Sequence, residues 1–262
     1  MYMSYKKRII YITILLTSLL LITSLVNIFI WKKESQEITK EINNLQNDFI
    51  FIEYEEPQEE IKEIPKKDKS NPYKDYITTA NIDFKELKKI NNKTKGWIKV
   101  NSTNINYPFV QAKDNKYYLN HSFNKEYNSA GWVFLDYRNN FNKLDKNNII
   151  YAHGRYDKTM FGTLKNIIKK EWYTNKKNHT ITIYTENKIS KWKVFSIYKI
   201  KTTNDYLKIY FTDKQFMEFQ NMLLKRSIHN FNTKLNKEDI ILTLSTCYNK
   251  NEKVVLHAKL IQ

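Results

Sequence analysis

The feature that most constrains this chain is an uncharged, strongly apolar run over residues 9–31, "IIYITILLTSLLLITSLVNIFIW". A helix of about 20 apolar residues crosses the hydrocarbon core of a bilayer. A cleavable signal peptide would have a shorter apolar core and a small-residue cleavage site, and a buried core helix is rarely so long without a charge. The sequence therefore predicts a transmembrane signal anchor at residues 9–31. We expect residues 1–8 in the cytoplasm, Trp31 at the outer interface and the rest of the chain outside the cell.

The residues that follow the apolar run are polar. Residues 32–75 hold three of the four prolines and mixed blocks of charge, as in "EYEEPQEEIKEIPKKDKSNP". This composition is typical of an extended or partly helical stalk, and the helix can continue through residues 34–50. We therefore expect an extracellular stalk or linker over residues 32–75 and one globular domain over residues 76–262.

The globular part is dominated by short β-like runs, and 41% hydrophobic residues provide enough apolar surface for a core. Eight such runs occur: "GWIKV", "INYPFVQ", "GWVFLDY", "NNIIYAH", "HTITIYT", "KWKVFSIYKI", "DIILTLSTC" and "KVVLHAKLI". They predict a mainly β fold, either a closed barrel or a sandwich. Three segments have helical spacing instead: "FKELKKI", with Phe84, Leu87 and Ile90 on one face, "MFGTLKNIIKKEWY", and "TDKQFMEFQNMLLKRSI", which Thr212 or Asp213 can cap.

The net charge of +17 is compatible with a nucleic acid, an anionic membrane surface or an anionic cell-wall polymer as partner. It is equally compatible with a Lys- and Asn-rich coding bias that has no binding role. The lysines are scattered, and no nucleic-acid motif or glycine-rich phosphate loop is present in the sequence. We therefore expect no nucleic acid as partner.

The single cysteine, Cys247, ends a strand-like run and cannot form an internal disulfide. A nucleophilic thiolate needs a base or a cation and a donor for the oxyanion. Of the five histidines, His153 directly follows a strand-like run, where functional side chains are held rigidly. We expect His179 and His229 to be solvated in Asn-rich loops, and His257 to be a core or surface histidine in mid-strand. The spacing alone does not establish that Cys247 and His153 meet.

Four ordered segments resemble one family. "TLSTC" followed by "KVVLHAKL" is similar to the active-site strand pair of class B sortases, and "NNIIYAHGRYDKTMFGTL" to their histidine segment. The stretch from "GWIKV" to "GWVFLDYRN" resembles the early barrel of that class, and a long helix before the cysteine strand distinguishes class B from class A. The resemblance covers about residues 80–262.

The resemblance implies a closed eight-stranded sortase-like β-barrel with helical inserts, an N-terminal helix and a long helix before the cysteine strand, preceded by the transmembrane helix. It further implies a cell-surface cysteine transpeptidase of Gram-positive bacteria that cleaves a C-terminal NPxTN-like sorting signal of a secreted protein after Thr. Cys247 would form the thioacyl intermediate and His153 would be the acid and base. The resemblance implies no metal and no organic cofactor. The acceptor would be an amine of a peptidoglycan precursor or of another protein, as in a pilin-polymerising sortase.

This sequence departs from the family at one position. The arginine that follows the cysteine in sortases aligns with Lys253, and the last arginine of the chain is Arg226. Lysine is a point charge without the planar fork of guanidinium, so the two are not equivalent. Lys253 can replace the arginine, Arg155 can turn into the site, or the domain is weakly active or inactive and binds sorting signals or wall polymer.

Other residues near the cysteine have possible roles. Alternation places Ser245 on the face of Cys247, where Ser245, and Thr246 beside it, are candidates to bind substrate or to serve as sheet hydroxyls. The backbone N–H of Tyr248 is a candidate oxyanion donor. Arg138 is expected to pair with a carboxylate such as Asp136. L,D-transpeptidases also use Cys and His, but "LSTC" lacks the glycine that precedes their cysteine.

Overall fold

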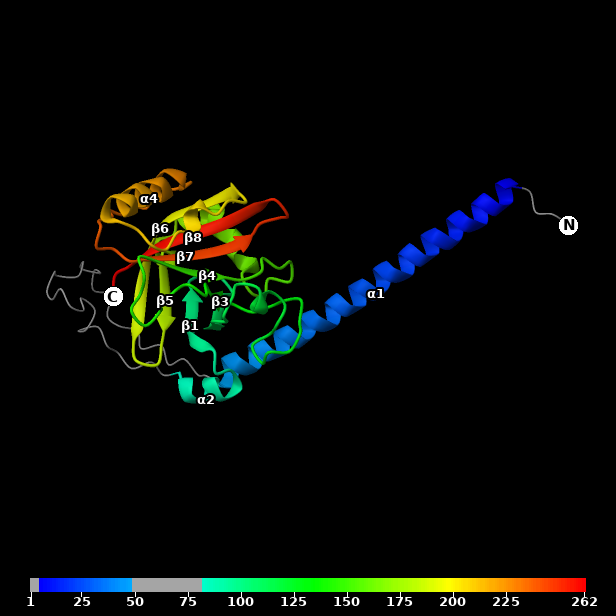
Figure 1. Cartoon of the computed structure of the whole chain (residues 1–262), viewed down its shortest axis with the longest axis horizontal. Coiled ribbons are helices and arrows are strands. Elements are labelled where there is room, and N and C mark those ends of the chain that lie inside the picture. Colours follow the sequence, from blue (N-terminus) through cyan, green and yellow to red (C-terminus); the bar gives the residue numbers. More distant parts are fainter. Residues whose placement is uncertain (1–4, 49–81) are drawn as a thin grey trace.

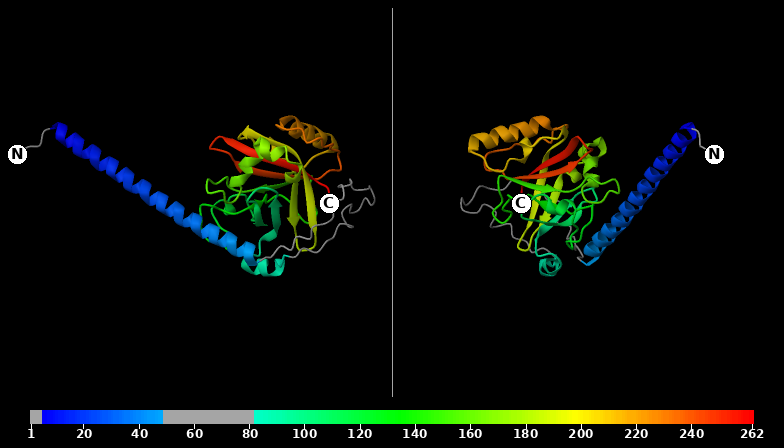
Figure 2. Two further views of the ribbon diagram at one scale, coloured as in Figure 1. Left: turned by 180° about the vertical axis from the view of Figure 1, so that it is seen from behind. Right: turned by 45° about the vertical axis from the view of Figure 1, so that its right-hand side comes forward.

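The computed structural model describes residues 5–48 and 82–262, and the predicted stalk from residue 49 to residue 75 lies outside these ranges. The described chain consists of a β-barrel with short helices around it and a long N-terminal helix that runs away from it (Figures 1 and 2).

The predicted closed eight-stranded barrel is confirmed. The strands follow one another around it in the order β1-β2-β3-β4-β7-β8-β6-β5. Only β2–β3 and β4–β7 pair in parallel, and the other paired neighbours in the described ranges are antiparallel. The strands are β1 (Thr94–Val100), β2 (Asn106–Val110), β3 (Phe134–Leu135), β4 (Asn147–Tyr151), β5 (Thr180–Tyr184), β6 (Ile189–Lys201), β7 (Ile241–Cys247) and β8 (Glu252–Leu260).

Two apolar clusters hold the fold together. The first fills the barrel and includes the fully buried indoles of Trp97, Trp132 and Trp192. The second lies between the outer face of β6 to β8 and helix α4 (Asp213–Arg226), and it includes Tyr198, Tyr206, Phe216, Phe219 and Leu223. Because both faces of β7 are covered, all of its residues except Cys247 are buried, and the strand is held rigidly.

The helices follow local sequence signals. α4 begins with a capping box in which the Thr212 hydroxyl and the Gln215 side chain each bind the other's backbone N–H. α2 (Phe84–Ile90) begins at Asp83, whose carboxylate accepts from two backbone N–H groups, but Ile90 is 46% exposed and does not join Phe84 and Leu87 in the core. The segment "MFGTLKNIIKKEWY" is mostly a 3-10 helix, η2 (Gly162–Ile168), before a short α3 (Lys170–Tyr173). Three further 3-10 turns are η1 (Tyr117–Leu119), η3 (Lys176–Asn178) and η4 (Asp205–Leu207).

The N-terminal helix α1 (Tyr5–Asp48) is continuous through the apolar run and beyond it. It is long and apolar enough to cross a bilayer, and none of its most apolar stretch is buried against the rest of the described chain. Its last turns differ, because Ile38, Ile42 and Leu45 are buried at helical spacing in the barrel cluster. Residues 32–48, the start of the predicted stalk, continue the helix, as the sequence allowed, but these three side chains pack it on the barrel.

Candidate active site

Cys247 is the last residue of β7 and lies directly opposite Lys253 of β8. The Lys253 ammonium donates a hydrogen bond to the Cys247 sulfur, with Nζ 2.9 Å from Sγ. The thiol is half-buried, so solvent screens this contact only in part. A thiolate is the nucleophilic form of cysteine, and an adjacent cation stabilises it.

His153 follows β4, which pairs in parallel with β7 so that Tyr151 lies opposite Ser245. The pairing continues beyond the last strand residue, because the Thr246 hydroxyl donates to the Ala152 carbonyl at 2.8 Å. Extending the register by two residues from Tyr151 sets His153 beside Cys247. The structure thus brings together two segments whose proximity the sequence could not establish.

Gly154, directly after His153, allows this close approach. A Cβ atom at this position would collide with the Cys247 carbonyl oxygen, which is backbone and cannot move aside alone. Glycine is therefore required for the histidine segment to lie against the cysteine strand.

The His153 imidazole is oriented by a backbone carbonyl. Nε2 donates to the Leu119 carbonyl at 2.7 Å, and because a carbonyl only accepts, Nε2 carries a proton. In the neutral ring Nδ1 is then the basic nitrogen, and it has no hydrogen-bond partner within the described ranges. This orienting contact comes from a residue that no local sequence signal identified.

The hydroxyls that precede the cysteine bind other parts of the protein. Ser245 is 4% exposed and shares a hydrogen bond of 3.0 Å with the Tyr206 hydroxyl, and Thr246 is 3% exposed and bonded to Ala152. Ser245 thus joins β7 to η4, and Thr246 joins β7 to the residue that follows β4. The geometry therefore favours the sheet-hydroxyl alternative over direct contact with substrate.

Two further predictions do not agree with the geometry. The Tyr248 N–H donates to the Glu252 carbonyl at 2.8 Å in the β7–β8 turn, so it is not available to an oxyanion. The Arg155 guanidinium is 8% exposed and paired with Asp157 at 2.6 Å, so it does not turn toward Cys247. Of the alternatives for the missing arginine, the structure brings only Lys253 to the thiol.

Additional lysines surround the Tyr248 ring. The Lys199 ammonium lies 4.7 Å from the ring centroid and that of Lys165 lies 5.9 Å from it. Lys199 is also paired with Glu252 at 3.2 Å, whereas Lys165 contacts a second ring, that of Tyr156. These ammonium groups, which the sequence did not single out, lie against the ring of the residue that follows the cysteine.

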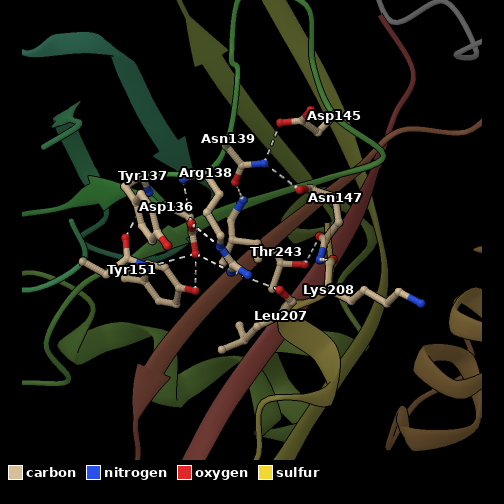
Figure 3. A network of polar contacts seen from close by, with 12 residues as sticks. Asp136, Tyr137, Arg138, Asn139, Asp145, Asn147, Tyr151, Leu207, Lys208 and Thr243 are labelled. Carbon is tan, nitrogen blue, oxygen red and sulfur yellow. Dashed lines mark hydrogen bonds and ion pairs between the residues drawn. The ribbon is translucent and has the colours of Figure 1, made fainter. Parts of the chain in front are cut away.

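A polar network contacts the cysteine strand β7 through Thr243, whose hydroxyl donates to Asn147 (Figure 3). The predicted pairing of Arg138 with Asp136 is confirmed, at 2.7 Å, and Arg138 also donates to the Leu207 carbonyl. Burial raises the pKa of Asp136, but hydrogen bonds from Arg138, Tyr151 and Asn115 outweigh it and hold this pKa below its ordinary range. The Asn147 amide binds the carbonyls of Tyr206 and Lys208. Together these bonds fix η4, which carries the Tyr206 hydroxyl to Ser245.

Of the two predicted alternatives for His257, a core or a surface histidine, the structure shows the core histidine. Nδ1 lies 2.9 Å from the Thr243 hydroxyl, which itself donates to Asn147, and Nε2 lies 2.8 Å from the Tyr198 hydroxyl. Since Thr243 gives its proton to Asn147, Nδ1 must donate and Nε2 must accept. A second ring proton would remove the acceptor that Tyr198 uses, and burial lowers the pKa of His257 to about 3.

We predict that this histidine makes the fold sensitive to mild acid. Its pKa is about 3 when folded and about 6.5 when unfolded, so only the unfolded chain takes up the proton in this window. Stability should fall as the pH drops below about 6.5, by about 2 kcal/mol at pH 5. Urea unfolding of the full chain in detergent at pH 7 and pH 5 measures this. His257→Gln should be less stable at pH 7 but lose less on acidification, and an unchanged slope would contradict the assignment.

His179 and His229 are not solvated as we expected. They lie in an aromatic cluster with Tyr173 and Phe231, and His179 Nε2 donates to the Tyr173 carbonyl at 2.8 Å. Burial lowers the pKa of His179. In residues 5–48 and 82–262, no three His, Cys, Asp or Glu side chains form a group that could hold a metal ion.

Comparison with known proteins agrees with this geometry. The model of the sortase domain matches residues 98–261. Sortase B of Staphylococcus aureus is 37% identical over 186 residues, which cover 68% of this chain and 75% of that protein. A Staphylococcus aureus sortase B–substrate complex superposes with a TM-score of 0.64 at 35% identity, covering 68% of this chain and 84% of the other. A sortase B complexed with triglycine gives a TM-score of 0.65 at 34% identity, with coverage of 68% and 85%.

The matched region includes the cysteine strand, the histidine segment and the helix between them. The chain therefore belongs to the sortase family of cysteine transpeptidases, in its class B.

Proposed function

We propose that this chain is a cell-surface transpeptidase that cleaves a C-terminal NPxTN-like sorting signal after Thr and transfers the protein to an amine of a cell-wall precursor. The observation that carries the proposal is the Lys253 ammonium 2.9 Å from the Cys247 sulfur, with the His153 segment alongside. Complexes of related sortases with a substrate and with triglycine support a peptide donor and an amine acceptor.

The proposed reaction has two acyl transfers. The Cys247 thiolate attacks the Thr carbonyl carbon, and Lys253 stabilises the developing oxyanion. The C–N bond breaks as protonated His153 gives a proton to the leaving amine, which leaves a thioester on Cys247. The acceptor amine then attacks the thioester, His153 takes its proton, and the C–S bond breaks to restore the thiolate.

The anchor fits this role. In the proposed arrangement residues 9–31 cross the membrane once, residues 1–8 are cytoplasmic and residues 76–262 form the extracellular catalytic domain. The basic residues Lys6, Lys7 and Arg8 before the apolar run favour a cytoplasmic N-terminus. An exported enzyme with one cysteine can keep that thiol free, because it has no partner for a disulfide.

A direct test uses the full chain in detergent micelles. It is incubated with a quenched NPxTN-type peptide, with and without an amine acceptor, and the protein and the products are weighed by mass spectrometry. We expect a thioacyl adduct on Cys247 that an added amine resolves to a transfer product and that Cys247→Ala cannot form. Absence of an adduct across a panel of sorting peptides would overturn the proposal.

A further inference from the structure

The last turns of α1 contact both segments that hold His153. One is the histidine loop (residues 153–161), which begins at His153 itself. The other is the Leu119 loop (residues 117–131), which contains the Leu119 carbonyl bound by the His153 ring. The β7–β8 turn lies on the side of the barrel from which α1 departs (Figures 1 and 2).

Asp157 is the centre of the histidine loop. Its carboxylate binds the Arg155 guanidinium, the Thr159 hydroxyl and the Ser35 hydroxyl of α1, the last at 2.6 Å. The Arg155 guanidinium in turn lies 5.8 Å from the centre of the Trp31 ring. The loop is therefore tied to α1 at its tip by an ionised group and by a cation–π contact.

The histidine loop requires such support. Lys158 and Met160 have φ values of +67° and +50°, which non-glycine residues rarely adopt. The loop closes on its own start, because the Phe161 N–H donates to the His153 carbonyl at 2.9 Å. Strained backbone of this kind persists where the surroundings over-determine it. The bond from Phe161 to His153 gives a change at the loop tip a path to His153.

The Leu119 loop is held by the same helix. Glu34 binds the Ser129 hydroxyl through its carboxylate and Asn128 through its carbonyl, the latter at 3.2 Å. The Glu41 carboxylate accepts from the Asn124 N–H at 2.8 Å. The Asn128 N–H donates to the Asn120 carbonyl, next to Leu119. Two hydrogen bonds, through Asn128 and Asn120, thus link α1 to the residue next to Leu119.

From these contacts we infer that the outer end of the anchor helix, residues 31–41, positions the catalytic histidine. Ser35 and Asp157 are the positioning residues of this device. They do not touch the reacting atoms; they hold the loop in which His153 begins, while Glu34 and Glu41 hold the carbonyl that orients its ring. The anchor therefore does more than tether the enzyme, and the inference rests on the proposed function because it assigns His153 a catalytic role.

The test compares Ser35→Ala with Thr39→Ala in the full chain in detergent micelles. Both variants remove a hydroxyl from α1, but the Thr39 hydroxyl binds only the Ser35 carbonyl of the same helix, within the part of the chain that the structure describes. We expect Ser35→Ala to lower kcat about 10-fold with KM unchanged, because small displacements of a catalytic group are costly. Thr39→Ala should leave kcat unchanged, and Ser35→Thr should restore most of it.

Hydrogen–deuterium exchange provides a readout independent of activity. In Ser35→Ala the amides of residues 154–161 should exchange faster, while those of the barrel strands and the melting temperature stay as in the parent. Unchanged exchange and unchanged kcat would overturn the inference, as would a loss of protection spread over the whole barrel. If the parent chain forms no thioacyl adduct, the proposed function fails, whereas the exchange result still decides whether α1 holds the loop.

Discussion

Replacing Lys253 with methionine is expected to lower kcat/KM for the sorting peptide by about 10²- to 10³-fold, the usual cost of losing one donor to an oxyanion. Within the described ranges, Lys253 provides the one ammonium in hydrogen-bond contact with the Cys247 sulfur. Methionine keeps the apolar length of the side chain and removes only the charge and its protons. Steady-state kinetics of the full chain in detergent measure the change.

Two companion variants sharpen this prediction. Lys253→Arg, which restores the residue usual in sortases, should keep activity within about 10-fold of the parent, since guanidinium also donates to an oxyanion. Lys250→Met removes a lysine from the exposed β7–β8 turn and should have no effect. The rate at which iodoacetamide alkylates Cys247 gives a readout that needs no peptide, because the chain has one cysteine. Full activity of Lys253→Met would show that the cation is dispensable.

Replacing His153 with glutamine is expected to lower kcat by about 10²- to 10⁴-fold, the range supplied by a positioned acid and base. Glutamine can still donate to the Leu119 carbonyl, so the loop should keep its path while the transferable proton is lost. The pH dependence of kcat should lose the limb that the imidazole contributes. Rate profiles of the two proteins over the same pH range measure both effects.

His179→Gln is the matched control for this change. The His179 ring also donates from Nε2 to a backbone carbonyl and is half-buried, but it precedes β5, which pairs with β1 and β6 and does not contact β7. It should alter stability without altering the shape of the rate profile. Equal losses of kcat in the two variants would indicate a structural effect and contradict the assignment of His153.

The geometry also bears on whether the domain only binds sorting signals. That alternative depended on the missing arginine, since Cys247 and His153 are present. The β7–β8 register sets Lys253 opposite Cys247, so its ammonium places a positive charge beside the thiol. Gly154 lets the histidine segment lie against the Cys247 carbonyl. Close approach of these two segments favours an enzyme over a domain that only binds.

Local patterns in the sequence were sufficient for the elements of the fold. Short β-like runs predicted the eight strands, and Thr212, one of the two predicted caps, marks the start of α4. The pairing of Cys247 with Lys253 could also be predicted from the sequence, because a short turn joins their two strands. Each of these features depends on residues that are near one another along the chain.

The tertiary structure decided the features that depend on distant segments. The Leu119 carbonyl that orients His153, the Tyr206 hydroxyl on Ser245 and the docking of α1 on Asp157 are contacts between such segments. The same holds for the pairing of Arg155 and for the exposure of Ile90. Periodicity gives the face on which a side chain lies, but not which segment covers that face or which carbonyl lies within reach. The sequence by itself predicted the apolar helix that could anchor the chain, the strands and the candidate reactive groups, whereas barrel closure and loop paths determined how those groups are held.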